Sequence, residues 1–240
     1  MLGKIFTERF TFSDSDSIVV VGLGRFGGAV AAALMEMGHD VMGIDRDPDL
    51  VQLWADKLTH AVQADSTNES VMRQLGVADF SHAIVGIGTD LSSSLMSLMV
   101  LTELGIKDIW AKALTPEHGQ LAQRVGAHHV IYPEADMGKR VAHLITGRMM
   151  DYIEFDDGFA IAKIHAPAMT HHKTLAQAHV REHFGITVVG VKRAGQEFQH
   201  GLPETLVRPD DILIVSGATR KIEQFASGAA SGLASGGKNS

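Results

Sequence analysis

The sequence predicts an α/β fold: a doubly wound parallel sheet, then a crossover helix, then a second, smaller α+β domain. Short apolar segments alternate with helical segments through residues 17–134, which is typical of the βαβ units that build a parallel sheet. A glycine-rich turn follows the first apolar segment and leads directly into an alanine-rich helical segment. After residue 134 the rhythm changes, and strand patterns separated by turn residues predominate.

Each expected strand of the first domain is a short apolar run, and each expected helix repeats apolar residues at helical spacing. The strands are expected at residues 18–21, 41–44, 61–64, 83–87, 109–111 and 129–131. The helices are expected at residues 26–37, 49–57, 69–75, 91–104 and 116–125. Because the strands run parallel, their carboxyl ends meet at one edge of the sheet, where open α/β folds bind their ligands.

The second part of the chain starts with one more amphipathic helix, because apolar residues recur at helical spacing within residues 134–149. These residues are Met137, Val141, Leu144 and Ile145. Strands are then expected at residues 159–166, 186–193 and 210–217, with a short helix at 173–184. We therefore divide the chain into an N-terminal extension (1–16), a first domain (17–134), a crossover helix (135–150), a second domain (151–226) and a flexible Gly/Ser/Ala tail (227–240).

Composition narrows the classes of function. The chain has 240 residues, 45% of them hydrophobic and 20% charged, as in an ordinary globular protein. Its formal net charge of −7 argues against a nucleic-acid partner, because such binding depends on Lys and Arg that neutralise phosphates. It has no cysteine, which excludes disulfides, thiolate metal sites and a cysteine nucleophile. No apolar run is long enough to span a membrane and no secretory signal is recognisable, so a cytoplasmic location is expected.

Gly22, Gly24 and Gly27 form a G-x-G-x-x-G motif between the first expected strand and the first expected helix. Gly22 permits the tight turn, Gly24 lets a phosphate approach the backbone, and Gly27 lets the helix pack closely on the strand. The helix N-terminus offers N–H groups and the positive end of a dipole to the anion. Asp45 closes the second strand, where a carboxylate accepts hydrogen bonds from ribose hydroxyls. In this context the motif predicts a Rossmann-like nucleotide-binding domain.

Further candidate residues lie at the carboxyl ends of the other expected strands, and therefore at the same edge of the sheet. Asp65 and Ser66 follow the third strand and are expected to contact adenine or ribose; the alternative is that they cap the next helix. Gly88 follows Ile87 after the fourth strand and permits close contact with a ligand. Lys112 ends the fifth strand and is expected to reach phosphate; the alternative is an ordinary solvated surface lysine.

Two arginines depart from the usual dinucleotide-binding pattern. Arg25 precedes Phe26 inside the glycine motif and places a cation at the mouth of the phosphate site. It is either a solvent-facing residue at the helix start or a charge that binds a terminal phosphate, in its own or a neighbouring subunit. Arg46 follows Asp45, where it is expected to stack on adenine or to attract a 2′-phosphate.

Several of these segments resemble the RCK family, the cytoplasmic regulators of potassium conductance, and in particular its KtrA and TrkA type. The segments are VVVGLGRFGGAVA, GID, QADST, IVGIG and IWAKA, and above all GAHHVIYPEADMGKRVA, which has no counterpart in dehydrogenases. The second domain, with KTLAQAHVREHFGITVVGVKR and LPETLVRPDDILIVSG, is similar to the small C-terminal RCK subdomain. The resemblance covers about residues 17–226.

The resemblance implies a nucleotide-sensing regulatory subunit rather than an enzyme. Such subunits form homodimers that assemble into an octameric gating ring beneath a membrane-embedded potassium-translocating subunit of the KtrB or TrkH type, at the inner face of the cell membrane. In KtrA-like members, ATP favours the open pathway and ADP the closed one. The resemblance further implies that the helix from Asp136 to Met149 exchanges between protomers and that Arg25 contacts the terminal phosphate held by the dimer partner. It also implies that Glu134 helps to bind a cation (Mg²⁺, Ca²⁺ or Na⁺) near the paired nucleotides.

Three alternatives stay open at this stage. ATP or ADP and NAD(H) present the same adenine, ribose and phosphate groups to the motif, so the sequence does not choose between them. Cyclic di-AMP binding to the second domain would depend on Arg181 and Ile186, because the aspartate that binding members tend to carry in the short helix is missing. An NAD(P)-dependent oxidoreductase with a reduced substrate domain is the alternative function, although the second domain is small for that role.

Overall fold

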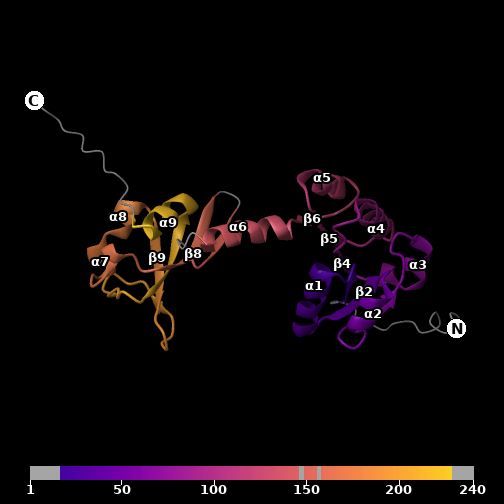
Figure 1. The fold of residues 1–240 in the computed structure, drawn as a ribbon, viewed down its shortest axis with the longest axis horizontal. Coiled ribbons are helices and arrows are strands. Elements are labelled where there is room, and N and C mark those ends of the chain that lie inside the picture. The colour runs from indigo at the N-terminus through magenta and orange to yellow at the C-terminus, as the bar shows by residue number, and fades with distance from the viewer. Residues whose placement is uncertain (1–16, 146–148, 156–157, 229–240) are drawn as a thin grey trace, which may run out of the picture. The chain divides into compact units, whose positions relative to one another are not determined.

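The computed structural model describes residues 17–145, 149–155 and 158–228 (Figure 1). The expected N-terminal extension lies outside the described residues, as does the expected tail beyond residue 228. The chain divides into two compact units, residues 1–135 and residues 136–240. Among the described residues, no helix combines the length and the apolar character that crossing a membrane requires.

The first unit is a six-stranded parallel sheet with the strand order β3-β2-β1-β4-β5-β6. Its strands are β1 (Ser17–Val21), β2 (Asp40–Asp45), β3 (His60–Gln63), β4 (His82–Val85), β5 (Asp108–Lys112) and β6 (His129–Ile131). Its helices are α1 (Arg25–Glu36), α2 (Pro48–Trp54), α3 (Glu69–Gln74), η2 (Val77–Asp79), α4 (Leu91–Glu103) and α5 (Pro116–Arg124). Every strand and α-helix expected in this domain is present, and the doubly wound fold class is confirmed.

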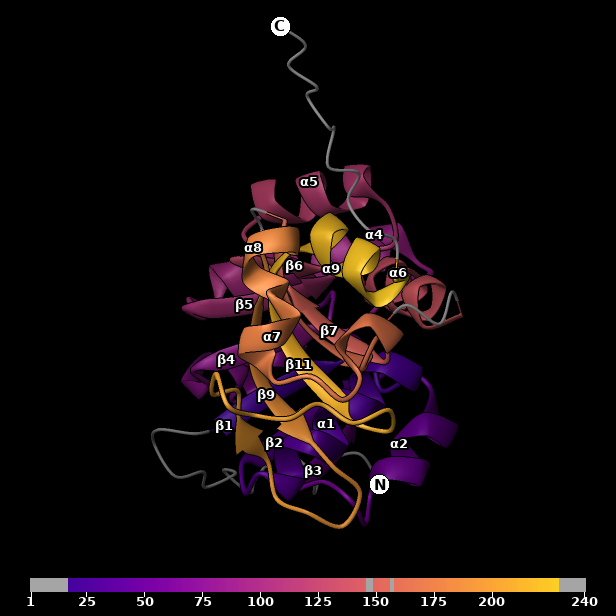
Figure 2. The same cartoon turned by 90° about the vertical axis from the view of Figure 1, so that its left-hand side faces the viewer.

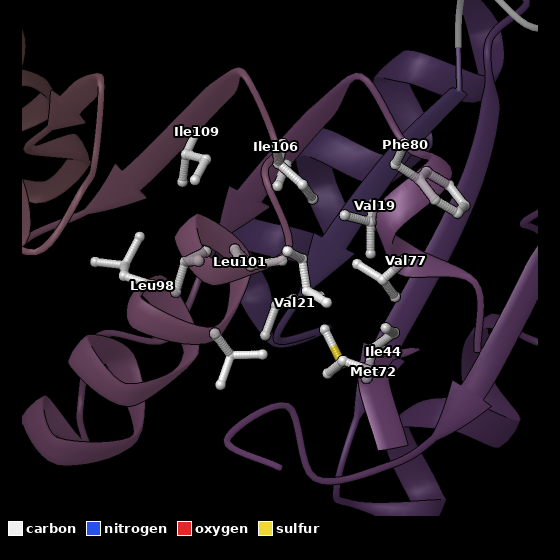
Figure 3. Packing of buried hydrophobic residues seen from close by; sticks show 14 of the residues in the cluster. Val19, Val21, Ile44, Met72, Val77, Phe80, Leu98, Leu101, Ile106 and Ile109 are labelled. Atoms are coloured by element: carbon white, nitrogen blue, oxygen red, sulfur yellow. The ribbon is translucent and has the colours of Figure 1, made fainter. Parts of the chain in front are cut away.

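Helices cover both faces of this sheet, because successive side chains of β1 are buried in two different cores. Val19 and Val21 point into a core that they share with buried residues of α3, α4 and α5 (Figure 3). Ile18 and Val20 point the other way, into a core built with α1 and α2. Burial on both faces explains why the strands are continuous apolar runs in the sequence rather than alternating ones.

The chain order reverses at β1, because β2 lies on one side of it and β4 on the other. In doubly wound folds, the carboxyl ends of the strands at this switch point are where ligands bind. Two backbone hydrogen bonds fix this edge here: the Gly22 N–H donates to the Ile44 oxygen at 2.8 Å, and the Gly86 N–H donates to the Val21 oxygen at 2.7 Å. The glycine turn therefore sits at the switch point.

The second unit contains a five-stranded antiparallel sheet with the order β10-β9-β11-β8-β7. Its strands are β7 (Asp151–Glu154), β8 (Phe159–His165), β9 (Thr187–Lys192), β10 (Gln199–His200) and β11 (Ile212–Ala218). Its helices include η3 (Ala168–Thr170), α7 (Leu175–Ala178), α8 (Val180–Phe184) and α9 (Thr219–Ala226). Helices α8 and α9 lie beside this sheet (Figures 1 and 2), where Phe184 and Phe225 are buried with Ile164 and Leu213. The expected smaller α+β fold is confirmed.

Helix α6 (Pro133–Ile145) ends earlier than the crossover helix expected at residues 135–150. Residues 146–148 lie outside the described residues, and Met149 is not helical: it is 2% exposed in the core of the second sheet. The prediction that the helix reaches Met149 was wrong, because an apolar residue at helical spacing fits a buried position beside a strand equally well. Within the second unit, Arg140 and His143 of α6 pair with Asp151 at 2.7 Å and Glu223 at 3.1 Å.

Other local differences concern short elements. The single helix expected at residues 173–184 is two helices, α7 and α8, because His179 between them adopts a left-handed conformation with a φ of 47°. Strands β7 and β10 and helix α9 were not expected. Each of them is too short, or carries too few apolar residues, to give a clear periodicity: α9, for example, buries Ile222 and Phe225 alone.

An ion pair between Arg193, which follows β9, and the buried Asp211, which precedes β11, connects the ends of these two strands. The Asp211 side chain is 3% exposed and accepts hydrogen bonds from Arg193 Nε at 2.8 Å and Nη2 at 3.1 Å. The Arg208 N–H donates to the same carboxylate at 2.8 Å, and Arg193 Nη2 also donates to the Leu206 oxygen at 2.6 Å. Burial raises the pKa of Asp211, but the hydrogen bonds from Arg193 and Arg208 outweigh burial and hold this pKa below its usual value.

Asp211→Ala is expected to lower the free energy of unfolding of the second unit by about 3 kcal/mol, because the largely buried Arg193 side chain, 15% exposed, loses its partner charge. Urea denaturation of the full chain measures the loss. Asp151→Ala is the matched control: its ion pair with Arg140 is 2.7 Å long, but both side chains are about half exposed. Its cost should stay below about 1 kcal/mol. Equal losses in the two variants would contradict the assigned role of Asp211.

Candidate functional site

The glycine turn connects β1 to α1 through three different constraints. Gly22 has a φ of 89°, which favours glycine, and a Cβ there would lie 3.0 Å from the Ile87 side chain. A Cβ at Gly27 would overlap the Gly22 oxygen, so α1 approaches the turn too closely for any other residue. Gly24 has extended backbone, with φ −65° and ψ −167°, and a Cβ there would meet no atom within 4 Å. The space beside Gly24 is therefore open to a ligand.

The N-terminus of α1 differs from those of its neighbours. The side chains of Asp47, Asn68, Asp90 and Thr115 accept hydrogen bonds from first-turn N–H groups of α2, α3, α4 and α5. No side chain of the described residues caps α1, which begins after Gly24. Its first N–H groups, together with the positive end of the helix dipole, can therefore bind an anion.

Asp45 lies at the end of β2 and orders the glycine turn. Its Oδ2 accepts a hydrogen bond from the Leu23 N–H at 2.7 Å, and its Oδ1 accepts one from the Asp47 N–H at 2.9 Å. Each carboxylate oxygen can accept a further hydrogen bond, so the expected contact with ribose hydroxyls is compatible with this arrangement. Asp45 thus has a structural role that sequence reasoning did not foresee.

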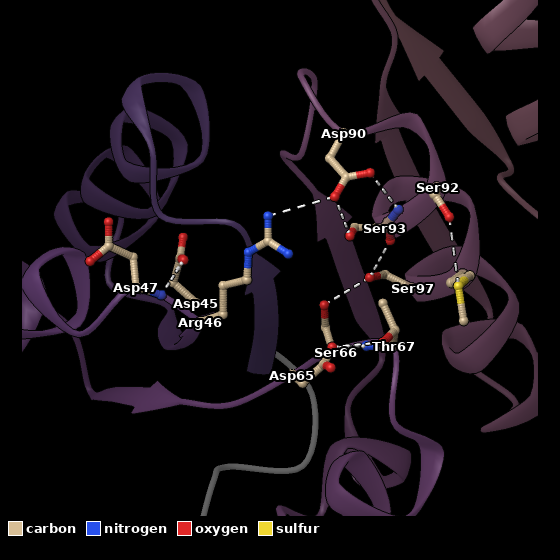
Figure 4. Close-up of polar contacts among 11 residues, drawn as sticks. Asp45, Arg46, Asp47, Asp65, Ser66, Thr67, Asp90, Ser92, Ser93 and Ser97 are labelled. Carbon is tan, nitrogen blue, oxygen red and sulfur yellow. Dashed lines mark hydrogen bonds and ion pairs between the residues drawn. The ribbon is translucent and has the colours of Figure 1, made fainter.

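Arg46 faces an acidic neighbour across the carboxyl edge (Figure 4): its Nη2 lies 3.6 Å from Asp90 Oδ2. Asp90 also accepts hydrogen bonds from the Ser93 hydroxyl at 2.6 Å and the Ser93 N–H at 3.0 Å. These bonds are the main reason why the pKa of Asp90 is lowered, with the Arg46 charge a smaller contribution. Arg46 therefore pairs with a carboxylate at this edge, and its expected role beside adenine or a 2′-phosphate stays a prediction.

Asp65 and Ser66 lie at the same edge (Figure 4), but neither caps a helix. Asp65 Oδ1 accepts hydrogen bonds from the Thr67 hydroxyl at 2.7 Å and the Thr67 N–H at 3.0 Å, and Ser66 Oγ lies 2.7 Å from Ser97 Oγ. The cap of α3 is Asn68, so the capping alternative was wrong. Since Ser66 is 7% exposed, Asp65 is the accessible member of the pair.

Lys112 is not a solvated surface residue, and that alternative was also wrong. Its side chain is 11% exposed, and its Nζ donates a hydrogen bond to Glu134 Oε1 at 2.6 Å. The same Nζ lies 5.6 Å from the centroid of the Phe26 ring. Gly88 makes room for this side chain, because a Cβ there would lie 3.1 Å from Lys112 Cε. The fold therefore brings Phe26, Gly88, Lys112 and Glu134 together.

Glu134, near the start of α6, lies close to two cations of the first unit. The hydrogen bond from Lys112 is the largest cause that lowers the pKa of Glu134; slight burial opposes it, and the charges of Lys112 and Arg25 lower it further. Arg25 is exposed and is the first residue of α1. An anion bound at this helix N-terminus would compete with Glu134 for both cations.

The expected cation site is less complete than the phosphate site. Among the residues that the structure describes, no group of three or more His, Asp or Glu side chains is placed to hold a metal ion. Glu134 fits as one oxygen ligand, and hard cations such as Mg²⁺ or Ca²⁺ need several. The remaining ligands would have to come from phosphates or from a partner subunit.

The two residues on which cyclic di-AMP binding would depend differ in their exposure. Ile186 is 1% exposed in the core of the second sheet, so its side chain does not face a surface ligand. Arg181 of α8 is exposed. Cyclic di-AMP binding to the second unit stays a prediction.

Sequence reasoning missed three residues that shape the site. Asp90 and Ser97 complete the polar network of the carboxyl edge, and Trp54 donates a hydrogen bond from Nε1 to the Leu23 oxygen at 3.1 Å. Asp90 directly precedes a helical pattern, which is a recognisable cap signal. Trp54 and Ser97 give no such signal, because their partners are distant in sequence.

Gly27→Ala is expected to destabilise the first unit by about 2 kcal/mol or more, because the new Cβ would overlap the Gly22 oxygen and α1 would have to move. Gly24→Ala is the matched control and should stay within about 0.5 kcal/mol of the wild type, since its Cβ would enter open space. Urea denaturation of both variants tests this. An unchanged Gly27→Ala or a strongly destabilised Gly24→Ala would refute the assigned constraints.

Comparisons with known proteins cover both units. The family model of the TrkA-N domain matches residues 18–133, and that of the TrkA-C domain matches residues 159–227. Ktr system potassium uptake protein C of Bacillus subtilis (strain 168) is 38% identical over 207 residues, which are 86% of this chain and 94% of the relative. Ktr system potassium uptake protein A of the same organism is 33% identical over 225 residues, which are 93% of this chain and 98% of the relative.

A solved structure shares the fold at lower identity. The GsuK channel bound to NAD superimposes with a TM-score of 0.62 at 18% identity, over 90% of this chain and 40% of the channel chain. The chain thus spans about two fifths of that channel. Both of these relatives are potassium uptake proteins. With both domain models matched and two such relatives covered almost completely, this chain belongs to the RCK family of TrkA-N and TrkA-C proteins that includes the Ktr potassium uptake proteins.

Proposed function

We propose that the chain is a nucleotide-sensing regulatory subunit of a Ktr-type or Trk-type potassium uptake system. The observation that carries the proposal is the uncapped N-terminus of α1, with Arg25 and Lys112 beside it and Asp45 at the end of β2. This arrangement offers N–H groups and cations to phosphates, and a carboxylate to ribose. The NAD bound to the GsuK channel, which shares the fold, supports a nucleotide as the ligand.

Lys112 connects the phosphate site to helix α6. Its Nζ donates to Glu134, which lies in the first turn of that helix. A phosphate at the N-terminus of α1 carries at least as much charge as one carboxylate and forms strong hydrogen bonds with an ammonium group. Bound nucleotide therefore competes with Glu134 for Lys112, and the start of α6 responds to the occupancy of the site.

ATP and ADP differ at this site by one phosphate group and its charge. Arg25 is exposed at the mouth of the site and is available to the additional phosphate, in its own protomer or in a dimer partner. A ligand shifts a conformational equilibrium only by its different affinities for the two states. In this proposal, Arg25 supplies that difference, so that ATP favours the open potassium pathway and ADP the closed one.

Glu134 is assigned to a cation in the ATP-bound form. Once phosphate has taken Lys112, Glu134 carries an unpaired negative charge next to further negative charge. Mg²⁺, Ca²⁺ or Na⁺, coordinated by Glu134 and by phosphate oxygens, would offset that repulsion. The role of this residue is then to make the response to ATP depend on the cation.

Helix α6 provides the surface for assembly. Its side chains Met137, Val141, Leu144 and Ile145 are 54%, 42%, 39% and 80% exposed. A contiguous apolar stripe of this kind marks a contact with a partner. We assign it to the crossover between protomers of a homodimer, which assembles into an octameric ring on the cytoplasmic side of a membrane-embedded potassium-translocating subunit of the KtrB or TrkH type.

ADP at about one hundred times its dissociation constant is expected to raise the free energy of unfolding of the first unit by about 2.7 kcal/mol. Gly24→Ala should weaken ADP binding at least about tenfold, since a methyl group then occupies the space where phosphate approaches. Gly138→Ala in α6, where a Cβ also meets no neighbour, is the control and should bind ADP normally. Thermal shift with ATP, ADP, NAD⁺ and NADH measures this. Absence of any shift would refute the proposal, and a shift with NAD(H) alone would reassign the ligand.

Arg25→Ala is expected to lose most of the preference for ATP over ADP, and Glu134→Gln to lose the effect of added Mg²⁺ or Ca²⁺. Both variants should still bind ADP, because the glycine turn and Asp45 are unchanged. The measurement is potassium flux through the cognate membrane subunit in liposomes, with each nucleotide, with and without the divalent cation. Wild-type ATP/ADP ratios and cation responses in both variants would show that these residues have no part in sensing.

A further inference from the structure

Trp54, the last residue of α2, contacts both the glycine turn and helix α1. Its indole N–H donates to the Leu23 oxygen, with 3.1 Å between Nε1 and the oxygen. Its ring lies against Gly28 of α1, where a Cβ would overlap the ring atoms. Lys57 Nζ lies 5.1 Å from the ring centroid. Packing and a hydrogen bond therefore hold this indole in one position.

Leu23, between the first two glycines of the motif, is fixed through both of its backbone polar groups. Its N–H donates to Asp45 Oδ2 at 2.7 Å, and its carbonyl oxygen accepts from Trp54. Leu23 is 1% exposed, and its side chain packs so closely on Gly43 that a Cβ there would lie 2.7 Å from a Leu23 methyl carbon. Two side chains of the second βα unit thus determine the conformation of the turn.

The peptide group between Leu23 and Gly24 passes this restraint on to Gly24. A trans peptide is planar, so its C=O and N–H point in opposite directions. Because the Leu23 carbonyl is directed at Trp54, the Gly24 N–H is directed away from α2, toward the open side of the turn. The following peptide is set by α1 itself, since the Gly24 oxygen accepts from the Gly28 N–H at 2.8 Å.

We propose that Trp54 is a positioning residue of the nucleotide site, which holds the Leu23–Gly24 peptide so that the Gly24 N–H is aimed at a phosphate before the nucleotide binds. The inference rests on the proposed binding of an adenine nucleotide at this turn. Trp54 does not touch the nucleotide; it acts through the peptide that it holds. An N–H group oriented in the free protein increases affinity because less ordering is needed on binding.

The test removes the indole N–H and keeps the shape of the ring. Benzothienylalanine, in which sulfur replaces the N–H, is incorporated at position 54 of the full chain through an amber codon. The matched control carries the same residue at position 110, because Trp110 also donates its indole N–H, to Asp108 at 3.0 Å, but from the strand β5. Affinities for ADP and for adenosine are measured well below the unfolding temperature. Adenosine has no phosphate and serves as the readout for general damage to the site.

The expected result at position 54 is a loss of ADP affinity of about fivefold, the size expected for one misdirected hydrogen bond, with unchanged adenosine affinity. The control should bind both ligands as the wild type does. Unchanged ADP affinity at position 54 would overturn the proposal. Parallel losses of ADP and adenosine affinity would also overturn it, because they indicate a structural role. If the wild-type chain binds neither ADP nor adenosine, the proposed function is refuted as well. The wild-type measurement therefore distinguishes a failure of the proposed function from a failure of the proposed role of Trp54.

Discussion

The contact between helix α1 and the carbonyl oxygen of Gly22 is the constraint on which the rest of the first unit depends. Gly27 must be glycine for α1 to approach this oxygen, and Gly86 after β4 comes close to it too, since a Cβ there would lie 3.1 Å away. The ends of β1 and β4 and the start of α1 therefore meet around one peptide group. Since α1 packs against the strand at this point, its N-terminal N–H groups face the switch point of the sheet, where a ligand can reach them.

Charged groups at this edge pair with one another. Lys112 pairs with Glu134, and Arg46 pairs with Asp90. In the proposed complex, phosphate replaces Glu134 as the partner of Lys112, so the nucleotide affinity is a difference between two sets of contacts. Such an exchange lowers the nucleotide affinity, but it would suit a sensor, because phosphate binding would release Glu134. Glu134 lies in the first turn of α6, so the proposed exchange would take place at the start of that helix.

The strands, helices and glycine turn of the first unit could be predicted from local sequence, whereas the side-chain pairings of the site could not. The strands and helices of the first unit were predictable because buried runs and amphipathic segments alternate, and the glycine motif located the turn. Pairings such as Lys112 with Glu134 or Ser66 with Ser97 were not, because they join residues far apart in sequence and depend on how the elements pack. Met149 was misplaced for a similar reason: helical spacing does not show whether an apolar side chain is buried by its own helix or by a sheet.

The central claim is that an adenine nucleotide binds at the N-terminus of α1 and takes Lys112 from Glu134. A crystal structure of the chain with ADP tests this most directly. The account predicts phosphate oxygens within hydrogen-bond distance of the Gly24 N–H and of Lys112 Nζ, with Lys112 and Glu134 no longer in contact. A complex in which ADP lies elsewhere, or in which the nucleotide occupies the turn while Lys112 still donates to Glu134, would contradict it.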